Sequence, residues 1–435
     1  MRLRLAQMIL IALAGTALAA PLARAGDPPY VPGEVVAKLK GQPTEHDVKL
    51  PAGVTVPQAV RSLRANPKVA YANPNYLASA STVNPNDPGS SQPPQSHGWR
   101  IDQWNFLAPT GAAPGGANIQ GAWQNAQDAG VSGGRGVTVA VLDTGIAYRN
   151  KGTKFAHDPD LPPVTRFVSP KDFVDGDQLP LDENGHGTHV ASTIAQATDN
   201  DRGLTGVAYG SNLMPIRVLN RSEQGTASNI ASGIRYAVEH GADVINLSLE
   251  FKPVVRQCAQ IPGVCKALEA AAVHGVVVVA SAGNHHQPGV AYPARAGGVI
   301  AVGATTYRGC LADYSDYGFG LDLVAPGGGA DTSLDTQNPT CDPAAPAYAI
   351  RQYSLNPQAA AQGNFRKFGV IPLKGTSMAA AEVSGTAALL LAENPAWPRS
   401  QVESSLEGCT RLYGSQKYYG AGLLDSAAVT SGAGC

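Results

Sequence analysis

From about residue 99 onward, the sequence alternates short runs of consecutive apolar residues with longer stretches of helical spacing. Such runs are typical of strands buried on both faces of a parallel sheet, because helices cover both sides of such a sheet. The pattern predicts an α/β fold in three layers, with a mostly parallel central sheet between two layers of helices. The apolar runs are 137–142, 213–219, 244–247, 276–280 and 299–302, and the helical stretches are 186–197, 227–240, 266–274 and 377–393.

Four polar residues stand where these strands end or where the following helices begin. Asp143 closes the first apolar run, Asn284 follows the run 276–280, and His186 and Ser377 begin helical stretches. The carboxyl ends of parallel strands lie along one edge of a sheet, and ligands bind at that edge. We therefore expect these four side chains to meet at one end of the sheet.

The four residue types suit acyl transfer by a serine nucleophile. A serine hydroxyl is a weak nucleophile and needs a base such as His186, which in turn needs a carboxylate such as Asp143 to hold one tautomer. Ser377 begins a helix, where free backbone N–H groups favour developing negative charge. The amide of Asn284 can donate to the oxyanion of a tetrahedral intermediate. The set predicts an enzyme with a catalytic serine.

The motifs around these residues, in this order, resemble those of the subtilisin-like serine proteases. They read Asp-Thr-Gly at 143–145, His-Gly-Thr-His at 186–189, Ala-Gly-Asn at 282–284 and Gly-Thr-Ser-Met-Ala at 375–379. The likeness extends over about residues 99–428. It implies a secreted serine endopeptidase of subtilisin-like fold, made as a zymogen, that hydrolyses peptide bonds through an acyl-enzyme on Ser377.

The first hundred residues have a different organisation. Residues 1–25 place two arginines before an apolar run and small-residue cleavage sites, which is typical of a secretory signal peptide. Residues 26–80 carry strand and helix patterns of a small α+β domain, which the resemblance implies is an inhibitory and chaperone propeptide. Residues 81–98 have a linker composition and are expected to contain the maturation region. Residues 99–435 then form the peptidase domain.

The formal net charge of the 435-residue chain is only -1. This balance gives no electrostatic reason to expect nucleic acid or a membrane as a partner. We expect a monomer that is extracellular, or periplasmic if its source is a double-membraned bacterium. Its partners would be protein or peptide substrates and its own propeptide, acting as an intramolecular inhibitor.

Six cysteines in an exported chain favour disulfides over metal ligation. Spacing alone leaves the connectivity open. Because each loop would then be short, we predict the sequential pairs Cys258–Cys265, Cys310–Cys341 and Cys409–Cys435.

The resemblance also implies substrate-binding and calcium-binding positions. Substrate would pair as an added strand with residues near the cleft, and the residues carried over by the resemblance are Gly225, Ser248, Leu249, Gly283 and Ala291. Structural Ca²⁺, which prefers oxygen ligands, is expected at Asp160 with Asn200. A second cluster, Asp172, Asp175 and Asp177, resembles another calcium site, and a solvated acidic loop explains that cluster equally well.

The sequence departs from the usual pattern of these proteases at several positions. Glu223 and Glu250 stand where relatives commonly have glycine, and they predict a preference for Lys or Arg near the scissile bond. Carboxylates that simply face water are the alternative. After Ser377, Ala381 and Glu382 replace the usual Pro-His, which leaves open an enhanced acyl transfer to amines. A non-catalytic secreted peptide-binding protein of the same fold is the other alternative.

Overall fold

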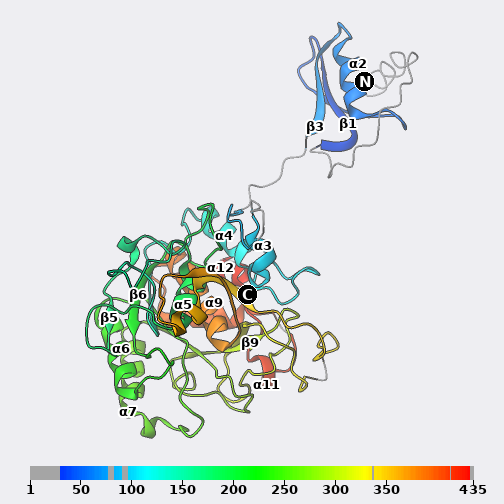
Figure 1. Ribbon diagram of the computed structural model, residues 1–435. Helices are drawn as coiled ribbons and strands as arrows, with labels where there is room; N and C mark the ends of the chain where they lie inside the picture. Colours follow the sequence, from blue (N-terminus) through cyan, green and yellow to red (C-terminus); the bar gives the residue numbers. More distant parts are fainter. Residues whose placement is uncertain (1–29, 77–82, 91–96, 336–337, 412, 432–435) are drawn as a thin grey trace. The chain divides into compact units, whose positions relative to one another are not determined.

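The computed structural model describes residues 30–76, 83–90, 97–335, 338–411 and 413–431 (Figure 1). They divide between two compact units, one ending at Thr82 and the other beginning at Val83. The predicted signal peptide, residues 1–25, lies outside the described residues, as does Cys435.

The smaller unit is an antiparallel sheet covered by one helix. Its sheet has the strand order β2-β1-β3. Thr55 and Gln58 form a capping box at the start of the helix. The apolar face of the helix packs on the sheet through Val60 and Leu63. The elements are β1 (Tyr30–Leu39), β2 (His46–Lys49), α2 (Val56–Arg64) and β3 (Val69–Tyr76).

The larger unit is built on a seven-stranded sheet with the order β10-β9-β8-β7-β4-β6-β5. Every neighbouring pair in this sheet is parallel. Four of the five predicted apolar runs lie on β4, β6, β7 and β8, and the fifth overlaps β9. The strands are β4 (Thr138–Asp143), β5 (Lys171–Asp172), β6 (Asn212–Arg217), β7 (Val244–Leu247), β8 (Val277–Ser281), β9 (Ile300–Thr305) and β10 (Leu323–Pro326).

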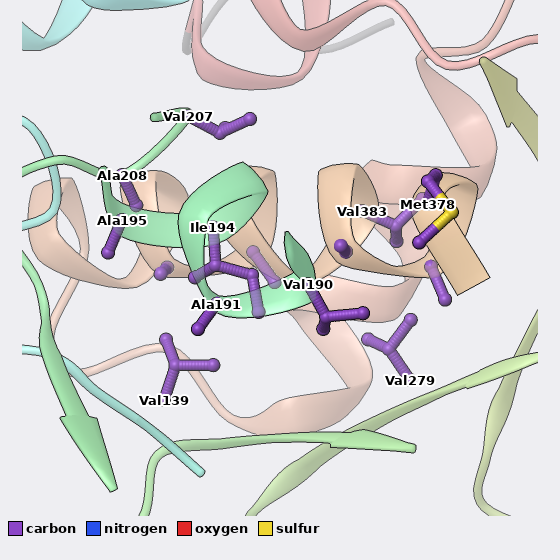
Figure 2. Close-up of a cluster of buried hydrophobic side chains, with 14 of the residues drawn as sticks. Val139, Val190, Ala191, Ile194, Ala195, Val207, Ala208, Val279, Met378 and Val383 are labelled. Carbon is purple, nitrogen blue, oxygen red and sulfur yellow. The ribbon is translucent and has the colours of Figure 1, made fainter. Parts of the chain in front are cut away.

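Two hydrophobic cores lie on opposite faces of this sheet, because successive strand residues point to opposite sides. Val139 and Val141 of β4 belong to one core, and Ala140 and Leu142 belong to the other. Helices α5 (His186–Ala195) and α9 (Thr376–Glu393) cover the first face (Figure 2), and α6 (Ala227–Glu239) and α7 (Pro262–Val273) cover the second. The predicted three-layer α/β/α architecture is confirmed.

The remaining elements surround these layers. A two-stranded antiparallel ribbon, β11 (Ile350–Leu355) and β12 (Phe368–Leu373), lies beside α5. The other helices are α3 (Trp99–Asp102), α4 (Ile119–Asp128), α8 (Pro357–Ala361), α10 (Arg399–Gly408), α11 (Gln416–Tyr419) and α12 (Ser426–Thr430), with short 3-10 turns at Trp104–Phe106, Val164–Arg166 and Cys258–Gln260.

Part of the segment predicted as a linker is bound to the larger unit. The Val83 N–H donates to Gln124 Oε1 at 3.1 Å, and the Gly89 N–H donates to the carbonyl of Gly203 at 2.9 Å. Asp87 between them is completely buried. Composition alone therefore predicts too long a linker. Hydrogen bonds with buried polar groups, and not an apolar core, attach this proline-rich stretch.

A buried carboxyl group lies inside α9. Glu382 Oε1 accepts a hydrogen bond of 2.6 Å from Asn105 Nδ2, whereas Glu382 Oε2 and Asn105 Oδ1 have no partner among the described residues. Burial raises the pKa of Glu382 well above its usual value. A protonated Glu382 also has an O–H that can donate to Asn105 Oδ1, so the site is suited to the neutral acid.

We expect Glu382→Gln to stabilise the protein, and to do so more as the pH rises. Above the ordinary pKa of a glutamate, the unfolded chain releases a proton that folded Glu382 retains, so the free energy of unfolding falls with rising pH up to the folded pKa. Glutamine removes this dependence. Thermal unfolding of both proteins at pH 5 and pH 8 measures the effect, with exposed Glu239→Gln as the control. An equal difference in Tm at the two pH values would contradict the prediction.

Candidate active site

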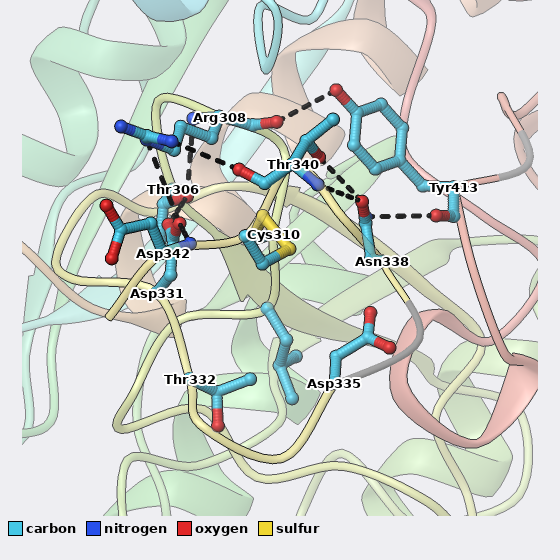
Figure 3. Close-up of a disulfide and its surroundings, with 12 residues drawn as sticks. Thr306, Arg308, Cys310, Asp331, Thr332, Asp335, Asn338, Thr340, Asp342 and Tyr413 are labelled. Carbon is cyan, nitrogen blue, oxygen red and sulfur yellow. Dashed lines mark hydrogen bonds and ion pairs between the residues drawn. A yellow bond between two sulfur atoms is a disulfide. The ribbon is translucent and has the colours of Figure 1, made fainter. Parts of the chain in front are cut away.

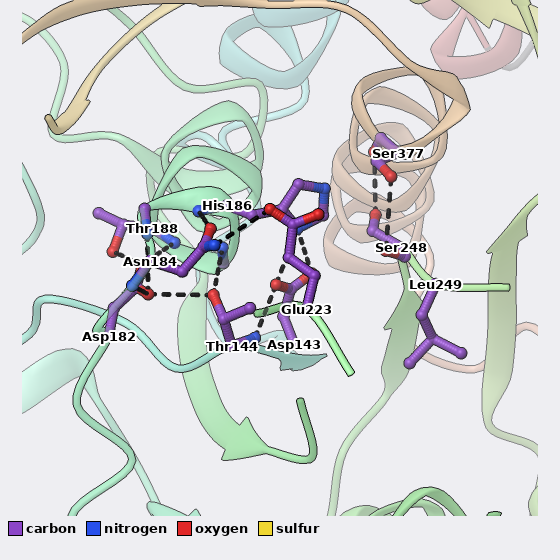
Figure 4. A network of polar contacts seen from close by, with 12 residues as sticks. Asp143, Thr144, Asp182, Asn184, His186, Thr188, Glu223, Ser248, Leu249 and Ser377 are labelled. Carbon is purple, nitrogen blue, oxygen red and sulfur yellow. Dashed lines mark hydrogen bonds and ion pairs between the residues drawn. The ribbon is translucent and has the colours of Figure 1, made fainter. Parts of the chain in front are cut away.

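Buried Asp143 and partly buried His186 are hydrogen-bonded at the carboxyl end of β4 (Figure 4). The imidazole Nδ1 of His186 lies 2.8 Å and 3.0 Å from the two carboxylate oxygens of Asp143. The Thr144 N–H also donates to Asp143 Oδ1 at 2.7 Å. Gly187 permits this approach, since a Cβ there would lie 2.2 Å from the Gly145 carbonyl. The pairing leaves Nε2 of His186 as the nitrogen available to another group.

The charge state of His186 depends on several neighbours. Burial alone would lower the pKa of His186. The charge and hydrogen bond of Asp143 outweigh burial and, with the charges of Glu223 and Asp182, raise the pKa to about 9. The surroundings therefore favour an imidazolium, the form that the base takes after it has removed a proton.

Ser377 is the second residue of α9 and lines the same cleft as His186, a cavity of about 810 Å³. Its hydroxyl donates to the Ser248 carbonyl at 3.4 Å, and its own carbonyl accepts a hydrogen bond of 2.9 Å from Ser248 Oγ. Among the described residues no hydrogen bond joins Ser377 Oγ to His186. Such contacts are often long or poorly aligned in a free enzyme and tighten only when substrate binds.

Asn284, after β8, also lines this cleft. Its Oδ1 accepts hydrogen bonds from the N–H and the hydroxyl of Thr376, at 2.9 Å and 3.1 Å. Because these two bonds fix the orientation of the amide, Nδ2 remains as a donor beside the start of α9. The structure therefore brings together all four residues that the sequence placed at the carboxyl end of the sheet.

A series of hydrogen bonds between buried polar groups, which the sequence did not predict, leads from the middle of α9 through β7 to Ser377. Ser384 Oγ donates to Asn246 Oδ1, Asn246 Nδ2 donates to Ser248 Oγ, and Ser248 Oγ donates to the Ser377 carbonyl, each at 2.9 Å. Asn246 and Ser384 are completely buried. The signal that could have revealed this series is a lone asparagine within an otherwise apolar strand.

Most of the predicted substrate-binding residues line the cleft. Glu250 is partly buried, and burial raises its pKa. Glu223 Oε1 accepts a hydrogen bond of 3.1 Å from Asn184 Nδ2. Gly283, which is buried, and Ala291 do not contribute to the cleft lining. The predicted residues that do are Glu223, Gly225, Ser248, Leu249 and Glu250.

The first pair of predicted calcium ligands is in contact. Asn200 Nδ2 lies 3.0 Å from Asp160 Oδ1, and burial raises the pKa of Asp160 to about 7. Two buried carboxylates that the sequence did not indicate lie nearby. Asp87 accepts the N–H groups of Asp199 and Asn200, and Asp158 Oδ2 is buried without a partner among the described residues. Carboxylate oxygens gathered in this way, with Asp158 Oδ2 left without a partner, fit a hard cation.

The second acidic cluster has an arginine as its partner. Arg217 Nη1 lies 2.9 Å from Asp172 Oδ2 and 2.6 Å from Asp175 Oδ2. Asp177 Oδ1 instead accepts the Leu179 N–H at 2.8 Å. Arg217 is nearly buried at the end of β6, so the two aspartates compensate its charge. The spacing of these acidic residues, which suggests a calcium site, is therefore also explained by their pairing with the guanidinium of Arg217.

The structure contains two of the predicted disulfides. Cys258–Cys265 joins the turn at Cys258–Gln260 to α7, and Cys310–Cys341 closes a loop beside Asp331 (Figure 3). Cys409 is disulfide-bonded as well, and its predicted partner Cys435 lies outside the described residues. None of the helices that the structure describes combines the length and the apolar character that a membrane span requires.

The sequence model of the subtilase family, Peptidase_S8, matches residues 134–422. The chain belongs to the subtilase family. Subtilisin Savinase of Lederbergia lenta is 36% identical over 297 residues, which cover 68% of this chain and 91% of the relative. The "Thermophilic serine proteinase" of Bacillus sp. (strain AK1) is 31% identical over 421 residues, covering 91% of this chain and 87% of the relative.

Solved structures agree with this assignment. A protease of Pseudoalteromonas arctica PAMC 21717 has a TM-score of 0.63 and 28% identity, covering 80% of this chain and 99% of the other. The subtilase match spans the strands and helices that carry Asp143, His186, Asn284 and Ser377. As a subtilase, the protein is a serine protease.

Proposed function

We propose that this subtilase is a secreted endopeptidase in which Ser377 is the nucleophile, His186 the general base, Asp143 the group that orients His186, and Asn284 the oxyanion donor. The observation that carries the proposal is the short contact of His186 Nδ1 with buried Asp143, in the cleft that Ser377 and Asn284 also line. The proposal is supported because acyl transfer by a serine requires a nucleophile, a base and a group that orients the base.

In this mechanism, His186 removes the proton of the Ser377 hydroxyl as the hydroxyl oxygen bonds to the carbonyl carbon of the peptide. Asp143 stabilises the imidazolium that forms, and Asn284 Nδ2 and the Ser377 N–H donate to the oxyanion. His186 then gives its proton to the leaving amine, and water hydrolyses the acyl-enzyme by the reverse roles.

Labelling with a serine-directed organophosphonate tests the proposal. The wild-type protein should be labelled at Ser377, and His186→Ala should not be labelled. A folded wild-type protein that is not labelled at Ser377 would favour the non-catalytic peptide-binding alternative.

The alternative of enhanced acyl transfer is tested by the ratio of aminolysis to hydrolysis in wild type and Ala381→Pro. Equal ratios in the two proteins would contradict the acyl-transfer alternative. Ala381 is buried and does not line the cleft, which weighs against that alternative.

We propose that the smaller unit is the inhibitory propeptide and that maturation cuts the chain before Val83. The contacts of Val83, Asp87 and Gly89 with the larger unit support this boundary, since a cut after them would remove buried partners of the loop 199–203. N-terminal sequencing of the secreted protein locates the cut.

We also propose a preference for Lys or Arg near the scissile bond. Both Glu223 and Glu250 line the cleft that holds Ser377, and a partly buried carboxylate pairs more strongly with a cation than an exposed one does. The cationic side chains that also line the cleft, Lys252 and Lys374, have no ion-pair partner among the described residues. They do not compensate the two glutamates by direct pairing.

Glu250→Gln should lower kcat/KM for substrates with Lys or Arg beside the scissile bond by about tenfold, the effect of losing about 1.4 kcal/mol of charge-assisted bonding. Matched substrates with a neutral isostere should be affected little. Peptide-library profiling of wild type, Glu250→Gln and distant Glu239→Gln measures this. No enrichment of basic residues in the wild-type profile would contradict the preference.

We propose a structural Ca²⁺ held by Asp160 and Asn200, with Asp87 contributing. When bound, the ion would compensate the buried carboxylates near the loop 199–203. Chelation should lower the Tm, because an ion present at about a thousand times its Kd stabilises the folded state by about 4 kcal/mol. Asp160→Asn should lose the response to the chelator, whereas exposed Asp128→Asn should keep it. The same Tm with and without chelator in the wild type would contradict the site.

A further inference from the structure

Three side chains from separate loops meet at the edge of the cleft. Glu250 follows β7, His285 follows β8, and Asp316 lies between β9 and β10. Each offers one ligand atom, and the three atoms all lie within 4.8 Å of one another. Glu250 and His285 also line the cleft, so an ion arriving from solvent can reach them.

Backbone hydrogen bonds hold these carboxylates in place. Asp316 Oδ1 accepts the N–H groups of His285 and Gln287, at 3.1 Å and 2.7 Å. Glu250 Oε2 accepts the Asn284 N–H at 3.1 Å. Since these bonds already position the ligands, binding an ion needs little reordering of the loops.

One carboxylate oxygen in this cluster has no partner. Asp316 is only 2% exposed, yet its Oδ2 accepts no hydrogen bond from any residue that the structure describes. It points toward Gly283, where a Cβ would lie 2.1 Å from Asp316 Oδ2 and 2.7 Å from Glu250 Oε2. Burial raises the pKa of both acids, and the Asp316 charge raises that of Glu250 further. A cation between them would relieve this repulsion.

The donor atoms indicate which cation fits. An imidazole nitrogen with two carboxylate oxygens suits zinc, whereas calcium prefers oxygen ligands alone. His285 Nδ1 lies 3.4 Å from Glu250 Oε2, close to the separation of about 3.3 Å between two tetrahedral ligands that are each about 2.0 Å from zinc. We propose that Glu250, His285 and Asp316 form an exchangeable zinc site at the edge of the cleft.

Zinc at this position has a consequence that rests on the proposed function. It would occupy Glu250 and lower the negative charge beside Asn284, so zinc should slow the cleavage of substrates with basic residues. Binding itself does not depend on catalysis. A direct binding measurement therefore separates the failure of the zinc site from the failure of the proposed protease mechanism.

Isothermal titration of the protein as secreted with ZnCl₂, in the presence of CaCl₂, tests the site. We expect one zinc ion per wild-type chain, and His285→Gln and Asp316→Asn should each weaken Kd by at least about tenfold. His274 is an exposed histidine at the opposite end of the sheet, so His274→Gln should bind zinc as the wild type does.

His285 is 40% exposed in its side chain, so its replacement should leave the fold intact even if Asp316→Asn does not. Zinc binding with the same Kd in wild type and His285→Gln would overturn the proposal, since it would place the ion elsewhere, for example at His186. The absence of measurable zinc binding to the wild type would also overturn it.

Discussion

Replacement of His186 by alanine should lower kcat by about a millionfold, the size of the loss known for the corresponding change in the related enzyme subtilisin. The expectation follows from the position of His186 between buried Asp143 and the cleft that holds Ser377. Without the imidazole, Ser377 loses the base that buried Asp143 orients. Active-site-titrated protein and a chromogenic peptide substrate give the measurement.

A matched variant separates this effect from general damage. His240 is an exposed histidine at the end of α6, and its replacement by alanine should leave kcat within a factor of about two. Circular dichroism and Tm of both variants report whether the fold is kept. A folded His186→Ala protein with more than about a tenth of wild-type activity would show that His186 is not the base.

Replacement of Asn284 by leucine should lower kcat by about 100- to 1,000-fold, the range known for removal of the corresponding donor in subtilisin. KM should change little, since the amide is expected to bind the oxyanion more strongly than the ground-state carbonyl. The two hydrogen bonds from Thr376 to Asn284 Oδ1 fix the amide and leave Nδ2 to make this contact.

Leucine also removes the acceptor of the Thr376 bonds, so a second variant is needed. Asn284→Asp keeps an acceptor for Thr376 but has no N–H to offer, and it should lose activity to a similar extent. Thr376→Val tests orientation alone and should cost less than either change at Asn284. An Asn284→Asp protein with wild-type kcat would contradict the role of Asn284 as oxyanion donor.

The sequence predicts the sheet well because burial on both faces leaves a direct signal. The apolar runs mark the strands, and the residues just after them are brought to one edge by the parallel arrangement alone. Asp143, His186, Asn284 and Ser377 could therefore be placed together without knowledge of any distance. The confirmed family assignment and the confirmed three-layer fold both rest on these segments.

Contacts between distant polar residues could not be predicted in this way. Asp87 lies in a segment of linker composition, and only the loop 199–203 shows why it is buried. Arg217 is the last residue of an apolar strand, and nothing in its neighbourhood in the sequence points to Asp172 and Asp175. The contacts of Asp316 could not be predicted from the sequence either, because Glu250 and His285 follow two other strands. Apolar residues that repeat every two residues in a strand, or every 3.6 in a helix, indicate which face of the element is buried. They do not indicate which charged side chains pair with one another.

The hydrogen bonds between Ser248 and Ser377 have a consequence for protein engineering. The Ser248 hydroxyl holds the Ser377 carbonyl, and the Ser248 carbonyl accepts the Ser377 hydroxyl. A strand that the resemblance assigns to substrate recognition is therefore tied directly to the residue proposed to carry the chemistry. Designers who wish to change substrate preference should leave this serine untouched and begin at Glu250, two residues further along, which lines the cleft and accepts its hydrogen bond from the Asn284 N–H.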